Sequence, residues 1–294
     1  MTDATAKRRA LAARVRERRF FVAPGVFDLI SARLADGMGF DCLYMTGYGA
    51  TASYLGLPDA GIATYTQMAD RARAMAEACA TPLIADADTG YGGLLNVHHT
   101  VRGYEAAGVS GIQIEDQEFP KKCGHTPGRR VIPLEQMVNK IKVAVEARRD
   151  PNFLIVARTD ARTGLGLDEA IRRGQAFAAA GADVVFVESP ESAQEFERVG
   201  REIDAPLLAN MVEQGRSPLL ARDTLTQYGF TMAIHPGVGF MAAAQALEQV
   251  YGYLLENGTT KGMAQPLYSF ADMNRLMGFE EVWAFDRKWA DEQQ

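Results

Sequence analysis

The sequence lacks several features that would assign it to particular classes of protein. Nowhere in its 294 residues do eighteen apolar residues run together, so we expect no transmembrane helix. Acidic side chains outnumber basic ones by 37 to 31, which gives a net charge of −6. A negative surface does not attract phosphate backbones or anionic lipid, so we expect no nucleic-acid partner and no membrane partner.

Cysteine is also scarce. Cys42, Cys79 and Cys123 are odd in number and far apart in the chain, so they do not suggest a disulfide framework. The first twenty residues are basic and alanine-rich but contain no apolar stretch and no cleavage site, which favours an opening helix over a signal peptide. Together these observations predict a cytoplasmic protein.

What the sequence does contain is a regular alternation of short apolar runs and amphipathic stretches. Runs such as LIADA and LIVAR are continuously apolar, which is typical of parallel strands buried on both faces. The stretches between them have the apolar spacing of helices. The runs lie at residues 21–26, 42–46, 82–86, 111–115, 153–157, 183–187, 206–209 and 230–234.

Eight strand–helix units in roughly 250 residues predict an α/β fold of the (β/α)8 TIM-type barrel class. A doubly wound open sheet is the alternative, but no strand is followed by a GxGxxG turn. We expect residues 1–294 to form a single barrel domain, with residues 259–294 as a C-terminal helical extension. The aromatic and methionine side chains of this extension are expected to pack on the barrel or on another subunit.

Polar residues gather where the predicted strands end, which is where such a barrel places its chemistry. Asp86 and Asp88 are two residues apart, so both carboxylates face the same side of an extended strand end. Two like charges are costly there unless a cation neutralises them, and carboxylate oxygens favour magnesium. Glu115 and Asp59 could complete the outer coordination shell of the metal ion. The alternative is that these acids cap a helix or bind loop amides.

Residues 119–130 form a long loop rich in glycine and proline, as expected for a lid over a barrel. Within it, two lysines precede Cys123 and a histidine follows two residues later, so the local charge favours a thiolate that can exchange a proton. The spacing does not suit zinc. The alternative is a solvated basic loop with an incidental thiol, and we expect Cys42 and Cys79 to be buried and inert.

The second predicted strand ends in the segment Tyr44-Met45-Thr46-Gly47-Tyr48-Gly49. Backbone relieved by glycine can aim N–H groups at a carboxylate or at a developing oxyanion. The segment is not a P-loop, because the Gly-Lys-Ser/Thr ending is missing.

These motifs together resemble the isocitrate lyase and phosphoenolpyruvate mutase superfamily, from Phe21 to about Gly258. The Lys-Lys-Cys-Gly-His segment resembles the carbon–carbon lyases of that superfamily. The resemblance implies a barrel that depends on Mg²⁺, with Mn²⁺ as a substitute, a swapped last helix and a homotetramer. It also implies an active site that closes when the cysteine loop folds over the substrate. The matching segments are residues 44–49, 56–59, 86–92, 114–117, 121–125 and 158–160.

The resemblance also implies a role for each matching residue. The metal site comprises Asp86 and Asp88, with Asp59 and Glu115 acting through water. Cys123 is the acid that protonates the departing carbanion, and Tyr44 and Lys121 are candidates for the network that removes the hydroxyl proton. The 2-oxo acid half is held by Thr46, Gly47, Tyr48 and Arg158, and the pocket beside it is lined by Gly124, His125, Glu188 and Asn210.

The implied reaction cleaves the C2–C3 bond of a substituted 2-hydroxy dicarboxylate and yields a 2-oxo acid, such as pyruvate, and a carboxylate. Methylisocitrate lyases carry a hydroxyl residue where this chain has Val212, and an arginine where a gapless register places Met241. Without that arginine, a third substrate carboxylate would be buried and unpaired at considerable cost. We therefore expect a malate with apolar substituents.

Three alternatives to this function remain open at the level of the sequence. The first is a methylisocitrate lyase. The second is hydrolysis or decarboxylation of oxaloacetate on the same barrel. The third is a non-catalytic protein that binds oxo acids, and the presence of the acids, the thiol and the arginine together argues against it.

Overall fold

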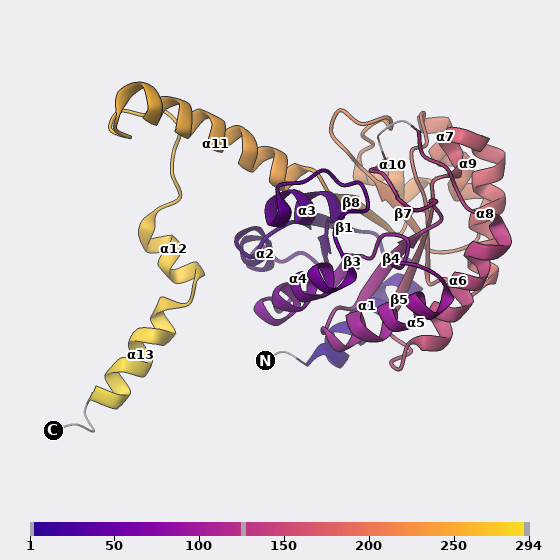
Figure 1. Ribbon diagram of the computed structural model, residues 1–294, viewed down its shortest axis with the longest axis horizontal. Coiled ribbons are helices and arrows are strands. Elements are labelled where there is room, and N and C mark those ends of the chain that lie inside the picture. The colour runs from indigo at the N-terminus through magenta and orange to yellow at the C-terminus, as the bar shows by residue number, and fades with distance from the viewer. Residues whose placement is uncertain (1–2, 125–127, 291–294) are drawn as a thin grey trace. The chain divides into compact units, whose positions relative to one another are not determined.

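A computed structural model describes residues 3–124 and 128–290 of the chain, and within them eight parallel strands close into a barrel (Figure 1). The strands pair in sequence order, and β1 pairs with β8 to complete the ring. The strands are β1 (Phe21–Val26), β2 (Leu43–Met45), β3 (Leu83–Asp86), β4 (Gly111–Glu115), β5 (Leu154–Thr159), β6 (Val184–Val187), β7 (Leu207–Asn210) and β8 (Met232–His235).

Helices follow the strands in the order expected for a (β/α)8 barrel, with additional helices at both ends of the chain and between the strands. They are α1 (Ala4–Arg16), α2 (Leu29–Asp36), α3 (Gly47–Leu55), α4 (Tyr65–Ala78), α5 (Leu94–Ala106), α6 (Leu134–Ala147), α7 (Ala161–Leu165), α8 (Leu167–Ala179), α9 (Ala193–Glu202), α10 (Arg222–Gln227), α11 (Val238–Asn257), α12 (Phe270–Leu276) and α13 (Phe279–Ala290).

The predicted barrel is confirmed. Each of the eight predicted apolar runs overlaps a strand whose ends lie within two residues of the predicted ones. The agreement has a physical basis: strands covered by helices outside and side chains inside are apolar on both faces, so they are continuous in the sequence.

Successive strand residues alternate between two separate hydrophobic clusters. In β5, for example, Leu154 and Val156 belong to the cluster inside the barrel, whereas Ile155 and Ala157 belong to the cluster between strands and helices. Because side chains alternate in direction along a strand, Arg158 is the next inward residue and lies at the carboxyl end. The same alternation turns Tyr44, Asp86, Glu115, Glu188 and Asn210 inward at the ends of their strands.

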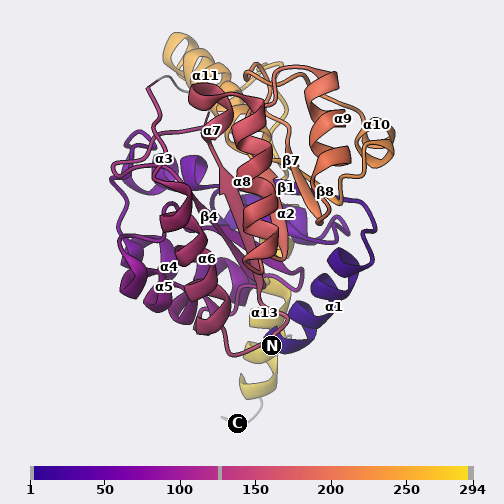
Figure 2. The same ribbon diagram turned by 90° about the vertical axis from the view of Figure 1, so that its right-hand side faces the viewer.

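Helix α1 closes the end of the barrel opposite to the carboxyl ends of the strands. Figure 2 shows it below the strands, with α7 above them. Its residues Leu11, Ala12 and Val15 are buried in the same cluster as the interior strand residues. Lys7 donates hydrogen bonds to the carbonyl oxygens of Ala76 and Cys79 at the end of α4. A cation is favourable at a helix C-terminus, so the basic residues of this segment help to attach α1 to the barrel.

The predicted inert cysteines are both buried. Burial raises the pKa of the Cys42 thiol to about 12. It raises the pKa of the Cys79 thiol to about 11. Both groups therefore remain thiols at neutral pH, whereas Cys123 is only partly buried.

The chain divides into two compact units, Met1–Phe240 and Met241–Gln294. The second unit contains most of α11 together with α12 and α13, so it begins before the predicted extension at residue 259. No residue of α11, α12 or α13 is buried. In the described part of the chain, no helix has the length and apolar character needed to span a membrane. The large exposed apolar residues of this unit include Tyr251, Leu255, Phe270, Trp283 and Phe285.

The packing of α1 against the barrel interior predicts that Leu11→Ala destabilises the protein. Leu11 is 1% exposed, so truncating it removes buried apolar area and leaves a cavity that costs about 2–5 kcal/mol of unfolding free energy. Urea denaturation would measure the change. Leu95→Ala is the matched control, because Leu95 is 81% exposed. Equal stability of the two variants would contradict this role of α1.

Candidate active site

The predicted site residues that the structure describes come together at the carboxyl ends of the strands. Asp86, Glu115, Arg158 and Asn210 are strand residues, and Glu188 directly follows β6. Tyr44 is the central residue of β2, and Asp59 lies in the loop after α3. The remaining residues come from the loops after β2, β3 and β4 and from the first turn of α3. His125 lies outside the described residues.

Lys121 joins the acidic residues of the site. Its ammonium nitrogen lies 2.5 Å from Asp59 Oδ1 and 2.6 Å from Asp88 Oδ1. All three side chains are at most 9% exposed. The sequence suggested that Lys121 would act as a charge beside the Cys123 thiol, whereas the structure shows it paired with two carboxylates.

Burial sets the protonation of this acidic cluster. Desolvation raises the pKa of Asp88 to about 6, although the Lys121 ammonium opposes the shift. Burial likewise raises the pKa of Asp86, and it raises the pKa of Glu115 well above the usual range. For Lys121 itself, burial disfavours the charged form, but Asp88 and Asp59 raise its pKa well above 10.5. Acids therefore outnumber cations here, and the raised pKa values show that their ionised forms lack sufficient positive charge. A further cation bound at this site would stabilise the carboxylates.

The donor set fits a hard divalent cation. Among residues 3–124 and 128–290, no three acidic, histidine or cysteine side chains form a complete metal-ligand cluster. Mg²⁺ does not require one, because it keeps several waters and binds proteins through one or two carboxylates. Asp86 Oδ2 faces Gly47, where a Cβ atom would approach it to 2.5 Å. The absence of a side chain at Gly47 thus leaves space beside this oxygen.

Tyr44 and Gln113 support Asp86 from inside the barrel. The Tyr44 hydroxyl donates to Gln113 Oε1 at 2.7 Å, and Gln113 Nε2 lies 3.4 Å from Asp86 Oδ1. The Asp88 backbone N–H donates to the same Asp86 oxygen at 3.0 Å. Burial raises the pKa of Tyr44 well above 10, so its hydroxyl is protonated at neutral pH. Gln113 is not among the site residues predicted from the sequence, although an amide within the apolar strand GIQIE is unusual at a buried position.

Arg158 lies at the centre of an array of carboxylates. Its guanidinium makes a two-point ion pair with Asp160, at 2.9 and 2.8 Å, and also contacts Glu115 at 3.4 Å and Glu188 at 3.2 Å. Burial alone would lower the pKa of Arg158, but these acids raise it well above its usual range. Asn210 donates to Glu188 Oε2 at 3.0 Å. The predicted anion-binding arginine is therefore charged and fixed in orientation.

Thr46, Gly47 and Tyr48 lie where β2 passes into α3. The Thr46 side chain accepts a hydrogen bond from the Gly49 N–H and begins the helix. The first backbone N–H groups of a helix have no intrahelical partner and favour negative charge. The Tyr48 ring is 43% exposed and packs against Phe240 at a centroid distance of 5.1 Å. The structure therefore brings these three predicted residues to the edge of the acidic cluster.

The lid segment lies close to Arg158 and Glu188. A Cβ atom on Gly124 would meet an Arg158 nitrogen at 2.2 Å and Glu188 Oε2 at 2.8 Å, so only glycine fits at this position. The Cys123 N–H donates to the Asp59 carbonyl oxygen at 3.2 Å. Cys123 therefore lies between the acidic cluster on one side and Arg158 on the other.

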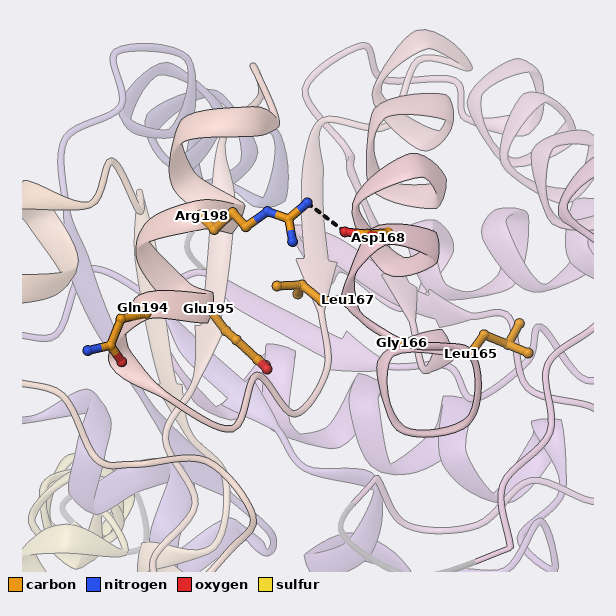
Figure 3. Close-up of a pocket in the computed structure, with 7 residues that line it drawn as sticks. All are labelled: Leu165, Gly166, Leu167, Asp168, Gln194, Glu195 and Arg198. Atoms are coloured by element: carbon orange, nitrogen blue, oxygen red, sulfur yellow. Dashed lines mark hydrogen bonds and ion pairs between the residues drawn. The ribbon is translucent and has the colours of Figure 1, made fainter.

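A separate pocket of about 450 Å³, drawn in Figure 3, lies beside the first turns of α8 and α9. Arg198 donates to Asp168 across it at 2.6 Å, so these charges are already paired. The pocket contains none of the predicted site residues and is not the candidate active site. Its lining residues are Leu165, Gly166, Leu167, Asp168, Gln194, Glu195 and Arg198.

Proteins similar to this chain are known. It is 47% identical over 283 residues to 2,3-dimethylmalate lyase of Eubacterium barkeri, which covers 95% of this chain and 98% of that protein. It is 43% identical over 267 residues to 2-methylisocitrate lyase of Aeropyrum pernix, covering 91% of this chain and 86% of that protein.

Solved structures of similar proteins share the fold. A structure of oxaloacetate acetylhydrolase with the inhibitor 3,3-difluorooxalacetate has a TM-score of 0.92 at 34% identity, and the match covers 97% of this chain and 98% of that one. A complex of phosphonopyruvate hydrolase with oxalate and Mg²⁺ has a TM-score of 0.87 at 31% identity, covering 99% of this chain and all of that one.

The model of the phosphoenolpyruvate phosphomutase family matches residues 11–255, which is most of the chain. This match agrees with the closed barrel and with the similarity to 2,3-dimethylmalate lyase over nearly the full length of both proteins. The chain therefore belongs to the phosphoenolpyruvate mutase/isocitrate lyase superfamily, and it is a carbon–carbon lyase.

Proposed function

We propose that this lyase depends on a divalent metal and cleaves the C2–C3 bond of an alkyl-substituted malate, releasing pyruvate or a related 2-oxo acid and a carboxylate. One observation carries the proposal: the Cys123 segment is bonded to Asp59 on one side and packed against Arg158 and Glu188 on the other. A substrate between the acidic cluster and Arg158 would thus lie next to the Cys123 thiol, which can donate a proton to it.

The metal site would comprise Asp86 and Asp88, with Asp59 and Glu115 acting through water, and would hold Mg²⁺ or Mn²⁺. When bound, the ion supplies positive charge that stabilises the oxygen on C2 as it becomes a 2-oxo group. The buried excess of carboxylates and the space beside Asp86 support this assignment. The similar phosphonopyruvate hydrolase, crystallised with oxalate and Mg²⁺, also supports it.

The residues around the proposed metal site bind the substrate and enclose it. Arg158 and the first-turn N–H groups of Gly47 and Tyr48 bind the 2-oxo acid half, next to Thr46. Gly124, Glu188 and Asn210 line the pocket; the resemblance implies the same role for His125, which lies outside the described residues. Because the lid excludes water, the carbanion is not exposed to uncontrolled protonation.

Proton transfer accompanies the bond cleavage. The substrate hydroxyl proton passes through the network of Tyr44 and Lys121 to a carboxylate paired with Lys121, because these two groups are themselves protonated at neutral pH. The C2–C3 electron pair moves onto C3. The Cys123 thiol gives its proton to C3 and becomes a thiolate. The proton count balances, because the proton taken from the hydroxyl replaces the one that the thiol gives.

Two positions favour an alkylmalate over a tricarboxylate. Val212 follows Asn210 by two residues and offers no hydroxyl, and Met241 offers no cation for a third carboxylate. The 47% identity to 2,3-dimethylmalate lyase supports the same substrate class. Methylisocitrate and oxaloacetate remain the competing substrates, because 2-methylisocitrate lyase and oxaloacetate acetylhydrolase are also similar to this chain.

We further propose a cytoplasmic homotetramer with a swapped last helix. The exposed apolar side chains of the second unit, including Trp283 and Phe285, support a subunit contact. The three free cysteines support a reducing compartment.

The proposed substrate class predicts which malates the enzyme cleaves. Cleavage of 2,3-dimethylmalate between C2 and C3 would yield pyruvate and propionate, and a coupled lactate dehydrogenase assay would detect the pyruvate. We expect the highest kcat/KM for 2,3-dimethylmalate, compared with malate, citramalate and methylisocitrate. Pyruvate formed from methylisocitrate alone would contradict the proposal. Ligand-induced stabilisation without any product would instead indicate a non-catalytic binding protein.

Replacing the thiol tests the role of Cys123. Cys123→Ser should lower kcat about 10²–10⁴-fold, because a hydroxyl is a much weaker acid than a thiol. The matched control is Cys79→Ser, which changes a buried thiol at the end of α4. Oxaloacetate consumption with release of oxalate and acetate is measured in parallel. Full activity of Cys123→Ser on oxaloacetate would favour the hydrolase and contradict the thiol as the essential acid.

Removal of the metal tests the acidic cluster. Treatment with a chelator should abolish cleavage, and Mg²⁺ or Mn²⁺ should restore it. Asp86→Asn should raise the dissociation constant of Mn²⁺ at least about tenfold, since it removes one anionic ligand. Titration calorimetry would measure this constant. Asp168→Asn is the control, because this acid on α8 is 85% exposed. Full turnover in the chelated enzyme would rule out the metal.

A further inference from the structure

The side chain of Gln117 holds the lid segment on one side of Cys123. Gln117 Nε2 donates to the Lys122 carbonyl oxygen at 2.8 Å, and Gln117 Oε1 accepts from the Lys122 N–H at 3.0 Å. The amide therefore binds both polar groups of one peptide residue, as a neighbouring strand would. Gln117 is 2% exposed, so these hydrogen bonds are shielded from water.

Ser189 holds the segment on the other side. Its hydroxyl lies 3.2 Å from the Gly124 carbonyl oxygen and 3.1 Å from Glu188 Oε1, and its backbone N–H donates to that same carboxylate oxygen at 2.7 Å. Ser189 is fully buried and has φ +59°, a left-handed conformation that is uncommon for residues other than glycine. Such a conformation persists only where surrounding contacts maintain it.

These contacts connect the lid to Arg158 in a closed ring. Gln117 Nε2 also donates to Glu115 Oε1 at 2.8 Å, while Glu115 Oε2 pairs with Arg158. On the other side, Ser189 contacts Glu188 Oε1, while Glu188 Oε2 pairs with Arg158. Each carboxylate therefore uses one oxygen for the lid contact and the other for the arginine.

The lid has a separate attachment that does not use these side chains. The backbone of Gln117 forms an antiparallel bridge with Val131, and the Glu118 N–H donates to the Arg130 carbonyl oxygen at 2.8 Å. Arg129 additionally pairs with Asp160 at 2.5 Å. The two ends of the loop are thus joined to each other and to the barrel at its base, whereas Gln117 and Ser189 add contacts to the residues on either side of Cys123.

We propose that Gln117 and Ser189 are positioning residues that fix the Cys123 backbone relative to Arg158, so that the thiol faces the carbon released by the substrate held there. Neither residue touches the reacting atoms. The proposal rests on the proposed lyase function and adds two residues through which it acts.

The test replaces each side chain by one of similar size that cannot make the contact. Gln117→Met and Ser189→Ala should lower kcat on the order of 100-fold, because a small displacement of a catalytic group is costly, and should change KM less than about threefold. The matched controls are Gln175→Met and Ser53→Ala. Both control residues also donate to a backbone carbonyl, but away from the lid.

A second readout does not depend on turnover. Alkylation of Cys123 by iodoacetamide, followed by mass spectrometry of its peptide, should be about tenfold faster in both variants, as expected when one net hydrogen bond is lost. Bound pyruvate should slow the reaction in the wild-type protein and in the controls but not in the variants. Melting temperatures identify any variant that has lost stability. The double variant should lose little more activity than either single variant, because both substitutions act on one segment.

Unchanged alkylation and unchanged kcat in both variants would overturn the proposal. So would a loss of kcat that only accompanies a lowered melting temperature. A wild-type protein that cleaves no alkylmalate would instead refute the proposed function, and the alkylation rates would still decide whether Gln117 and Ser189 hold Cys123.

Discussion

The burial of more carboxylates than cations at the mouth of the barrel is the constraint on which the rest of the site depends. A buried charge is costly unless it is paired, and the cations Lys121 and Arg158 each contact more than one acid. Lys121 bridges Asp59 and Asp88, and Arg158 contacts three carboxylates. Because these acids belong to different strands and loops, pairing them also fixes the loops. The remaining negative charge is what a divalent cation would neutralise.

The barrel and the location of the site could be predicted from the sequence for a simple physical reason. Strands buried on both faces are continuously apolar, and their ends are marked by the first charged residues, such as Asp86 and Arg158. The period of two along a strand then determines which residues face inward. The local pattern of apolar and charged residues was therefore sufficient to predict the strands and the residues that point into the barrel.

The contacts within the site could not be predicted in this way. The sequence places Lys121 beside Cys123, but the partners of its ammonium, Asp59 and Asp88, come from loops 62 and 33 residues earlier. Ser189 contacts Gly124 across 65 residues, and its role depends on how β6 lies relative to the lid. Gln117 was part of a recognised motif, yet only the fold shows that its amide binds Lys122. Side-chain partners that are distant in sequence leave no local signal.

The ring through Arg158 gives the buried acids a second function beyond charge compensation. A carboxylate has two oxygens, and in Glu115 and Glu188 one oxygen is used by the arginine and the other by the residue that holds the lid. If the proposed substrate anion binds Arg158, it would alter the interaction of both acids with the guanidinium, and the acids are hydrogen-bonded directly to Gln117 and Ser189. The connection from Arg158 to the backbone that carries Cys123 is short, because one side chain separates each acid from that backbone. This short connection also explains why glycine is required next to the cysteine: a side chain at position 124 would overlap the arginine and the acid that the ring brings together.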